Sequence, residues 1–254
     1  MEILLITGVA LIASLLTFFS GFGLGTLLMP IIALFFPLPI AIAITAIVHF
    51  SNNLLKFFLL VKHSDRSILL HFGLPAIIFA FLGAWCLELL SEWKWEVAYT
   101  FFDFTAHVTP LKLIIGLVIA LFLVVESSPT LHVPSAFKKL WLGGILSGFF
   151  GGLSGHQGAF RSLFLTQNAL SKEVFLATGV SIAVVVDLSR LSLYAKHWES
   201  ALAQWQLILI ATLSAFVGTM IGKFFLKKVS IEFIRLVVAW MLGSVAFLLI
   251  VGVL

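Results

Sequence analysis

Cationic side chains inside long apolar stretches are the residues of this 254-residue chain whose types and spacing best suit chemistry. Lys56 follows a long run without any charged residue, Arg161 lies three residues after Gly158, and Arg190 lies three residues after Asp187. A charge in hydrocarbon is costly and usually marks a pathway or a binding site. The planar fork of arginine donors matches an oxyanion such as a sulfonate. These cations predict a site for small anions, with an arginine that snorkels to lipid headgroups as the alternative for Arg161.

Polar residues accompany two of these cations at matching spacing. Asn53 precedes Lys56 by three residues, as Asp187 precedes Arg190. Residues three apart share a helix face, so Asp187 and Arg190 can form an ion pair, either as a structural pair or as part of the site. His49 lies one turn before Asn53 and is suited either to relay a proton near neutral pH or to pack through hydrogen bonds.

Two glycine-rich segments interrupt the apolar stretches. Glycine lets the backbone leave helical dihedral angles, and the half-helix that follows such a break presents free N–H groups and a positive dipole end to an anion. Close helix packing through small residues is the alternative. We expect functional breaks, in which His156 is suited either to donate to the anion or to pack through hydrogen bonds. The candidate ligands in these segments are Gly21, Gly23, Gly25, Gly155, His156, Gln157 and Gly158.

The elements that hold these residues are expected to be membrane-spanning helices. The chain is 61% hydrophobic and only 10% charged, against about 25% charged residues in soluble domains, and its mean hydropathy is +1.19. This composition excludes an ordinary soluble enzyme and a disordered chain, and the single Cys86 excludes a disulfide scaffold. A surplus of four positive charges is too small to indicate a nucleic-acid partner. No grouping of histidines and carboxylates has metal-ligand spacing, and we expect no cofactor.

The uncharged run from Ile3 to Leu55 shows how the chain is arranged. As one helix it would be about 80 Å long, against a hydrocarbon core of about 30 Å, so it must fold back. The hydrophilic segment 126–139 separates a first membrane repeat, residues 1–125, from a second, residues 140–254. Further apolar stretches predict spans at 67–87, 110–125, 140–169, 174–194, 200–222 and 234–254.

The two halves resemble each other at a fixed offset. A shift of 134 residues places Asn53 on Asp187, Lys56 on Arg190 and the first glycine cluster on the second. A repeat with glycine-broken segments at corresponding positions is typical of transporters, with a site at the repeat interface near mid-membrane. We predict an all-α polytopic membrane protein of about eight transmembrane helices in two homologous four-span repeats, with glycine-broken discontinuous segments. The relative direction of the repeats and the membrane orientation stay open.

The duplicated glycine motif resembles that of a known family. The segment Gly21-Phe-Gly-Leu-Gly-Thr-Leu-Leu-Met-Pro30 and its copy from Gly151 to Arg161 are similar to the paired motif of the TauE/SafE family, which exports sulfite and organosulfonates. The resemblance covers nearly the whole chain and implies a multi-pass permease in the bacterial inner membrane. His156 and Gln157 stand where an apolar residue and a glycine are usual, and Phe164 replaces the proline that would match Pro30.

We therefore predict a transporter, acting as an exporter of small sulfur-containing anions, and not an enzyme. Its partners are the anion and the lipid bilayer, with a homo-oligomer left open. One alternative is an intramembrane serine protease of the rhomboid type, with Ser154 in a Gly-x-Ser-Gly sequence as nucleophile and His49 as base. The counterpart of Ser154 in the first half lacks that context, which argues against the protease. The other alternative is an anion channel.

Overall fold

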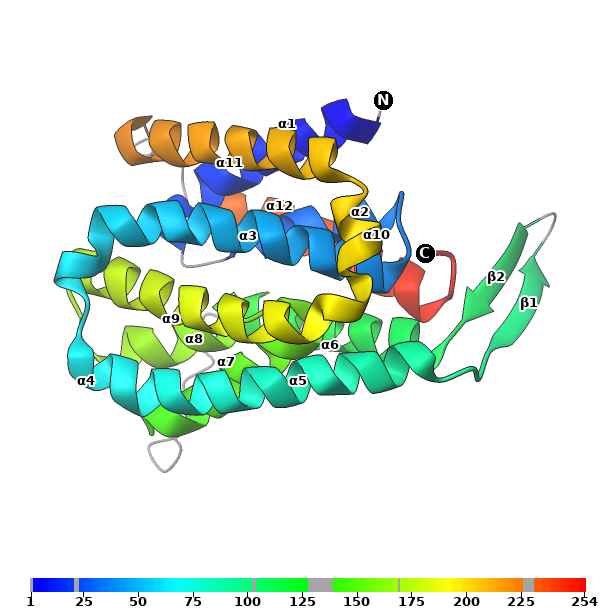
Figure 1. Ribbon diagram of the computed structural model, residues 1–254, viewed down its shortest axis with the longest axis horizontal. Helices are drawn as coiled ribbons and strands as arrows, with labels where there is room; N and C mark the ends of the chain where they lie inside the picture. Colours follow the sequence, from blue (N-terminus) through cyan, green and yellow to red (C-terminus); the bar gives the residue numbers. More distant parts are fainter. Residues whose placement is uncertain (1, 21–22, 102–103, 128–138, 169, 226–230) are drawn as a thin grey trace.

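Helices lie side by side along the long axis of the molecule, and a β-hairpin projects from one end (Figure 1). The computed structural model describes residues 2–20, 23–101, 104–127, 139–168, 170–225 and 231–254. The elements of the first half are α1 (Glu2–Ser20), α2 (Leu24–Ala33), α3 (Leu38–Leu60), α4 (Arg66–Ile68), α5 (Leu74–Glu92), β1 (Val97–Phe101), β2 (Phe104–Val108) and α6 (Pro110–Ser127). Those of the second half are α7 (Leu140–Ser154), α8 (Gly158–Leu165), α9 (Lys172–Leu193), α10 (Trp198–Leu202), α11 (Trp205–Phe225) and α12 (Ile231–Ile250).

Apolar helices dominate the described part of the chain, as predicted for a membrane protein. Four segments are long and apolar enough to cross a bilayer. Large apolar side chains such as Phe58, Phe224 and Trp240 point outward and are more than two-thirds exposed, as expected where lipid is the solvent. The four long segments are Leu38–His63, Arg66–Glu92, Lys172–Leu193 and Trp205–Phe224.

Both glycine clusters lie where one helix ends and another begins. Gly23 is extended, with φ of −83° and ψ of 143°, and directly precedes α2. Gly155 ends α7 with φ of 80°, in the left-handed region that favours glycine. Gly21 lies outside the described residues. Discontinuous helices are therefore present at both predicted positions.

Corresponding elements of the two halves recur at the offset found in the sequence. Each of three boundaries in the second half lies 134 residues after its counterpart in the first. These pairs are the ends of α1 and α7 (Ser20 and Ser154), the starts of α2 and α8 (Leu24 and Gly158) and the starts of α3 and α9 (Leu38 and Lys172). Corresponding helices also pack in corresponding ways. Helix α1 packs along α11 as α7 packs along α5, α3 packs against α9, and α6 packs against α12.

The central helices α3 and α9 run in opposite directions (Figure 1). Asn53, in the second half of α3, contacts Asp187 in the second half of α9. Ser64, beyond the end of α3, lies 2.9 Å (Oγ–Oγ) from Ser181, nearer the start of α9. Because contacts move toward the start of one helix as they move toward the end of the other, the pair is antiparallel.

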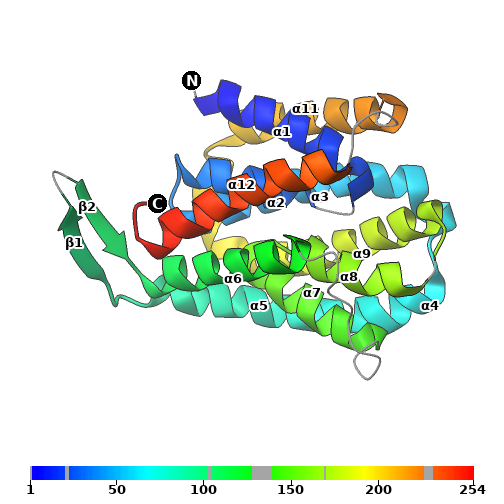
Figure 2. The ribbon, with the colours of Figure 1, turned by 180° about the vertical axis from the view of Figure 1, so that it is seen from behind.

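The helices of each broken pair also run in opposite directions. Gly143, near the start of α7, lies against Phe164 near the end of α8, whereas the Ser147 hydroxyl donates to the Gln157 carbonyl just before α8. Helix α2 turns back in the same sense, from Gly23 beside the middle of α3 to the short turn that begins α3 (Figure 2). The prediction counted each broken segment as one crossing, and that eight-span organisation is not confirmed.

The all-α prediction misses the hairpin formed by β1 and β2, which pair antiparallel with Val97 opposite Val108. Its residues include Val, Tyr, Thr and Phe, which favour strands. The hairpin is tied to the C-terminal segment, because the Tyr99 hydroxyl donates to the Val251 carbonyl at 2.6 Å and the His107 N–H to the Gly252 carbonyl at 2.9 Å. We call this the hairpin end of the molecule and the opposite one the α4 end.

Candidate functional site

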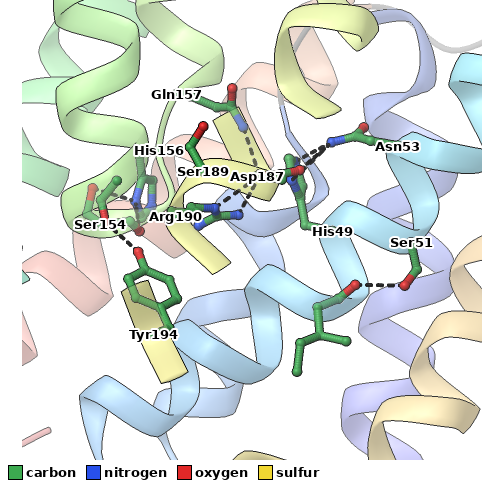
Figure 3. A network of polar contacts seen from close by, with 12 residues as sticks. His49, Ser51, Asn53, Ser154, His156, Gln157, Asp187, Ser189, Arg190 and Tyr194 are labelled. Atoms are coloured by element: carbon green, nitrogen blue, oxygen red, sulfur yellow. Dashed lines mark hydrogen bonds and ion pairs between the residues drawn. The ribbon is translucent and has the colours of Figure 1, made fainter. Parts of the chain in front are cut away.

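Asp187 is the centre of a buried polar cluster between α3 and α9 (Figure 3). Its Oδ2 accepts hydrogen bonds from His49 Nδ1 at 2.7 Å and Asn53 Nδ2 at 3.1 Å. Its Oδ1 accepts from Gln157 Nε2 and Arg190 Nε, both at 3.0 Å. The carboxylate is fully buried, and a buried charge is tolerated only when it is paired and hydrogen-bonded. The four donors meet that requirement.

Arg190 is held as the partner of Asp187. Its Nη2 lies 2.8 Å from Asp187 Oδ1, and both side chains are almost completely buried. Tyr194, the residue directly after α9, is buried and donates its hydroxyl to the Gly152 carbonyl. The positive charge of Arg190 is therefore neutralised within its own helix.

Lys56 and Arg161 instead line a small cavity beside this cluster. The cavity has a volume of about 30 Å³, room for about two waters. Arg161 Nη1 donates to Gln157 Oε1 at 3.2 Å, and Lys56 Nζ lies 5.6 Å from the centre of the Phe18 ring. Among the described residues that line the cavity, none is acidic. Two cations around a small polar space are suited to hold an anion.

The cavity lies between the cluster and the α4 end. Asn53 contributes to both the cavity and the cluster. The remaining lining residues come from the end of α1 and the first turns of α9, and they are Thr17, Phe18, Phe175, Leu176, Gly179 and Val180.

The two glycine breaks meet beside the same cluster. A Cβ at residue 25 would lie 3.8 Å from the carbonyl oxygen of Gly155, so the breaks are neighbours. A Cβ at residue 23 would lie only 2.7 Å from His49 Nε2, and one at residue 155 would lie 2.8 Å from Arg190 Nη1. Glycine at these two positions therefore leaves room for a cluster side chain.

The structure brings most of the predicted site residues together. His49, Asn53, Gln157, Asp187 and Arg190 form the cluster, Lys56 and Arg161 line the cavity, and Gly23, Gly25 and Gly155 adjoin the cluster. Gly158 is buried at the start of α8. Their roles as substrate ligands stay predictions.

His156 lies apart from the cavity. Its Nδ1 is 2.9 Å from the Ser154 carbonyl oxygen, and its ring stacks on Phe122 with 5.5 Å between centroids. Its Nε2 is buried and has no hydrogen-bond partner in the described part of the chain. The Ser154 hydroxyl donates to the Phe150 carbonyl at 3.0 Å, within its own helix.

Sequence reasoning missed Tyr194 and Phe18. Tyr194 follows Arg190 by four residues and so shares its helix face, a spacing that could have identified it. Phe18 gave no such signal, because its contact with Lys56 depends on how α1 packs against α3.

Comparison with known proteins identifies the family. The family model described as "Sulfite exporter TauE/SafE" matches residues 6–249. The chain belongs to the TauE/SafE family. No curated protein and no solved structure matches the chain.

TauE/SafE membership confirms the resemblance that the glycine motifs indicated. Together with the long apolar helices, it makes the chain a multi-pass membrane protein of a transporter family. This agrees with the expectation that the chain is not an enzyme. The two copies of the TauE/SafE glycine motif lie where α1 gives way to α2 and where α7 gives way to α8.

Proposed function

We propose that the protein is a carrier that exports small sulfur-containing anions, such as sulfite or sulfonates, through a site between its two halves. The observation that carries this proposal is the cavity lined by Lys56 and Arg161, beside the meeting point of the two glycine breaks. Membership of a family of sulfite exporters supports the same substrate class. Arg190 is not expected to contact the anion directly, because Asp187 already neutralises it.

The architecture supports alternating access. We propose that residues 1–125 and 140–254 are inverted repeats, joined by the segment 126–139. In each repeat a broken helix pair turns back inside the membrane, and three further helices cross it. Asn53 and Asp187 are 134 residues apart and hydrogen-bond to each other, so two equivalent positions touch. Such contact is expected only close to an axis that relates the repeats, where transporters of this kind place their site.

The charges at the two ends support an orientation with the α4 end in the cytoplasm. Cytoplasmic loops are enriched in Lys and Arg. The described charged residues near the α4 end are Lys62, Arg66, Lys139, Lys172 and Lys223 against Asp65 and Glu173. Those near the hairpin end are Lys94, Lys112 and Lys196 against Glu2, Glu88, Glu92, Glu96 and Glu199. The cavity then lies on the cytoplasmic side of the cluster, where a bacterial inner-membrane exporter loads its substrate.

The test is anion binding and flux by the purified protein in liposomes, with sulfite and methanesulfonate as probes. Arg161→Gln and Lys56→Gln should each weaken binding by about 1–3 kcal/mol, or about 5–150-fold, because each removes a charge-assisted hydrogen bond. Lys62→Gln removes an exposed cation just beyond the end of α3 and should leave binding unchanged.

The outcomes separate the candidate functions. Flux that saturates with anion concentration and falls in both cavity variants supports the carrier. Flux that rises linearly with concentration would indicate a channel. Normal binding and transport by folded Arg161→Gln would show that the anion site lies elsewhere.

A further inference from the structure

The charges around the proposed anion site do not balance. Among the described residues of the cluster and the cavity, the cations are Lys56, Arg161 and Arg190, and the single carboxylate is Asp187. All four are almost completely buried. When all three cationic side chains are protonated and His49 is neutral, positive side chains outnumber the carboxylate by two, and an arriving anion reduces this excess.

His49 has one ring nitrogen committed and one available for a proton. Its Nδ1 lies 2.7 Å from Asp187 Oδ2, and an ionised carboxylate can only accept a hydrogen bond, so Nδ1 carries a hydrogen. In the neutral ring Nε2 is then the acceptor. This nitrogen faces Gly23, which has no side chain to fill the space, and it lies 3.4 Å from Asn53 Nδ2. A second proton on His49 therefore has a defined position.

The groups around His49 decide when it can be charged. Coulomb interactions between buried charges are strong, because little water screens them. Burial opposes a positive charge on His49 most strongly, Asp187 favours it, and Arg190 and Arg161 oppose it. The adjoining helix α2 presents no charged side chain to His49 in its described residues. The charged and titratable groups that face His49 are Asp187 and Arg190 from α9, Arg161 from α8 and His156 from the second break.

Two amide side chains connect His49 with the cavity. Asn53 lines the cavity and donates to the same Asp187 oxygen that accepts from His49. Gln157 donates to the other oxygen of Asp187 and accepts from Arg161. A change of charge in the cavity is therefore transmitted through two short hydrogen-bonded paths to the histidine.

We propose that the carrier moves its anion together with a proton, which His49 takes up on Nε2 when the anion occupies the cavity. This inference rests on the proposed function. The proton comes from water on the side to which the site is open, and no covalent bond forms or breaks. By linkage, an anion that favours protonation of His49 must itself bind more tightly when His49 is protonated. Histidine is the side chain that ordinarily changes charge between about pH 5 and 8.

The deciding experiment is calorimetry of methanesulfonate binding to the purified full-length protein, in two buffers that differ in their heat of protonation. Methanesulfonate keeps one charge over this pH range, so any proton uptake belongs to the protein. We expect proton uptake on binding, and a dissociation constant that rises by up to about tenfold per pH unit where the proton is fully coupled. Absence of proton uptake at every pH between about 5 and 8 overturns the proposal.

Variants assign the proton to His49. His49→Gln should bind methanesulfonate without proton uptake and with an affinity that no longer depends on pH. His63→Gln, which removes an exposed histidine beyond the end of α3, should behave as the wild type. Proton uptake that persists in His49→Gln would place the proton on another group and refute the assignment.

The remaining outcomes are also decisive. If His49→Gln does not fold, the wild-type measurement still decides whether a proton is taken up, and His49→Asn, which places an amide on a shorter side chain, repeats the assignment. Binding of methanesulfonate without proton uptake overturns only the coupling. If the wild type binds neither methanesulfonate nor sulfite at any pH, the proposed function itself fails.

Discussion

The neutral pair of Asp187 and Arg190 gives the most direct test of how charge is arranged in this site. Both side chains are at most 1% exposed. In Asp187→Asn the carboxylate charge is lost, while the amide oxygen of the new side chain can still accept from His49 and Asn53. The buried Arg190 charge is then uncompensated, and breaking a buried pair in this way costs about 3–5 kcal/mol. We expect the free energy of unfolding to fall by that amount.

A second substitution should restore most of this stability. In the double variant Asp187→Asn/Arg190→Gln both charges are absent, and replacing a whole buried pair by neutral residues is often close to neutral. The double variant should therefore be more stable than Asp187→Asn alone. The measurement is equilibrium unfolding of the purified protein in mixed micelles, with anion binding determined on the folded fraction.

An exposed ion pair provides the matched control. Lys196 Nζ lies 2.6 Å from Glu92 Oε1, and both side chains are 63% exposed. Exposed pairs contribute little, so Lys196→Gln should leave unfolding almost unchanged. The idea of a mutually neutralised pair is wrong if Asp187→Asn lowers the free energy of unfolding no more than Lys196→Gln does. It is also wrong if the double variant is no more stable than Asp187→Asn.

Two further predictions concern the first break and the hairpin end. Gly23→Leu should abolish transport while the protein still folds, because the new Cβ would lie 2.7 Å from His49 Nε2 and displace the ring. Gly8→Leu should transport normally, because no atom lies within 4 Å of a new Cβ there. Equal loss of flux in both variants would contradict this. The hydrogen bond from Lys196 to Glu92 raises the pKa of the lysine, so the small stabilisation by Lys196 is present below its unfolded pKa of about 10.4 and is lost as pH rises through the higher folded value. Thermal unfolding of wild type and Lys196→Met should therefore converge at strongly alkaline pH, and a gap that widens there would refute the sign.

Several residues of the polar cluster could be predicted because the two halves of the sequence match at a fixed offset. The 134-residue offset pairs Asn53 with Asp187, and the structure shows that these two side chains hydrogen-bond to each other. The polar character of this matched pair inside apolar stretches indicated where to expect the cluster. The three-residue spacing of Asp187 and Arg190 likewise indicated their ion pair.

The direction of the broken helices could not be predicted in the same way. A glycine cluster permits the backbone to leave helical geometry, but the sequence does not say whether the chain then continues or reverses. The reversal depends on packing between distant segments, such as Gly143 against Phe164 and Gly23 against His49. The hairpin was missed for a related reason, because its hydrogen bonds to Val251 and Gly252 join residues that are far apart in the sequence.

The pair Asn53 and Lys56 differs in charge from the matching pair Asp187 and Arg190, and this difference explains why the cavity lies on one side of the cluster. The first half of the chain supplies Asn53 and Lys56, and the second half supplies Asp187 and Arg190, each 134 residues later. Asp187 neutralises Arg190, and Tyr194, one turn beyond Arg190, donates its hydroxyl to the Gly152 carbonyl. The amide of Asn53 offers Lys56 no opposite charge, and Lys56 lines the cavity together with Arg161. An amide at position 53, where position 187 has a carboxylate, thus leaves the described lining of the cavity without an acidic residue. Asn53→Asp should then offset at most one of the two cationic charges of the cavity and weaken anion binding, while Asn53→Ser should add no charge and weaken it much less.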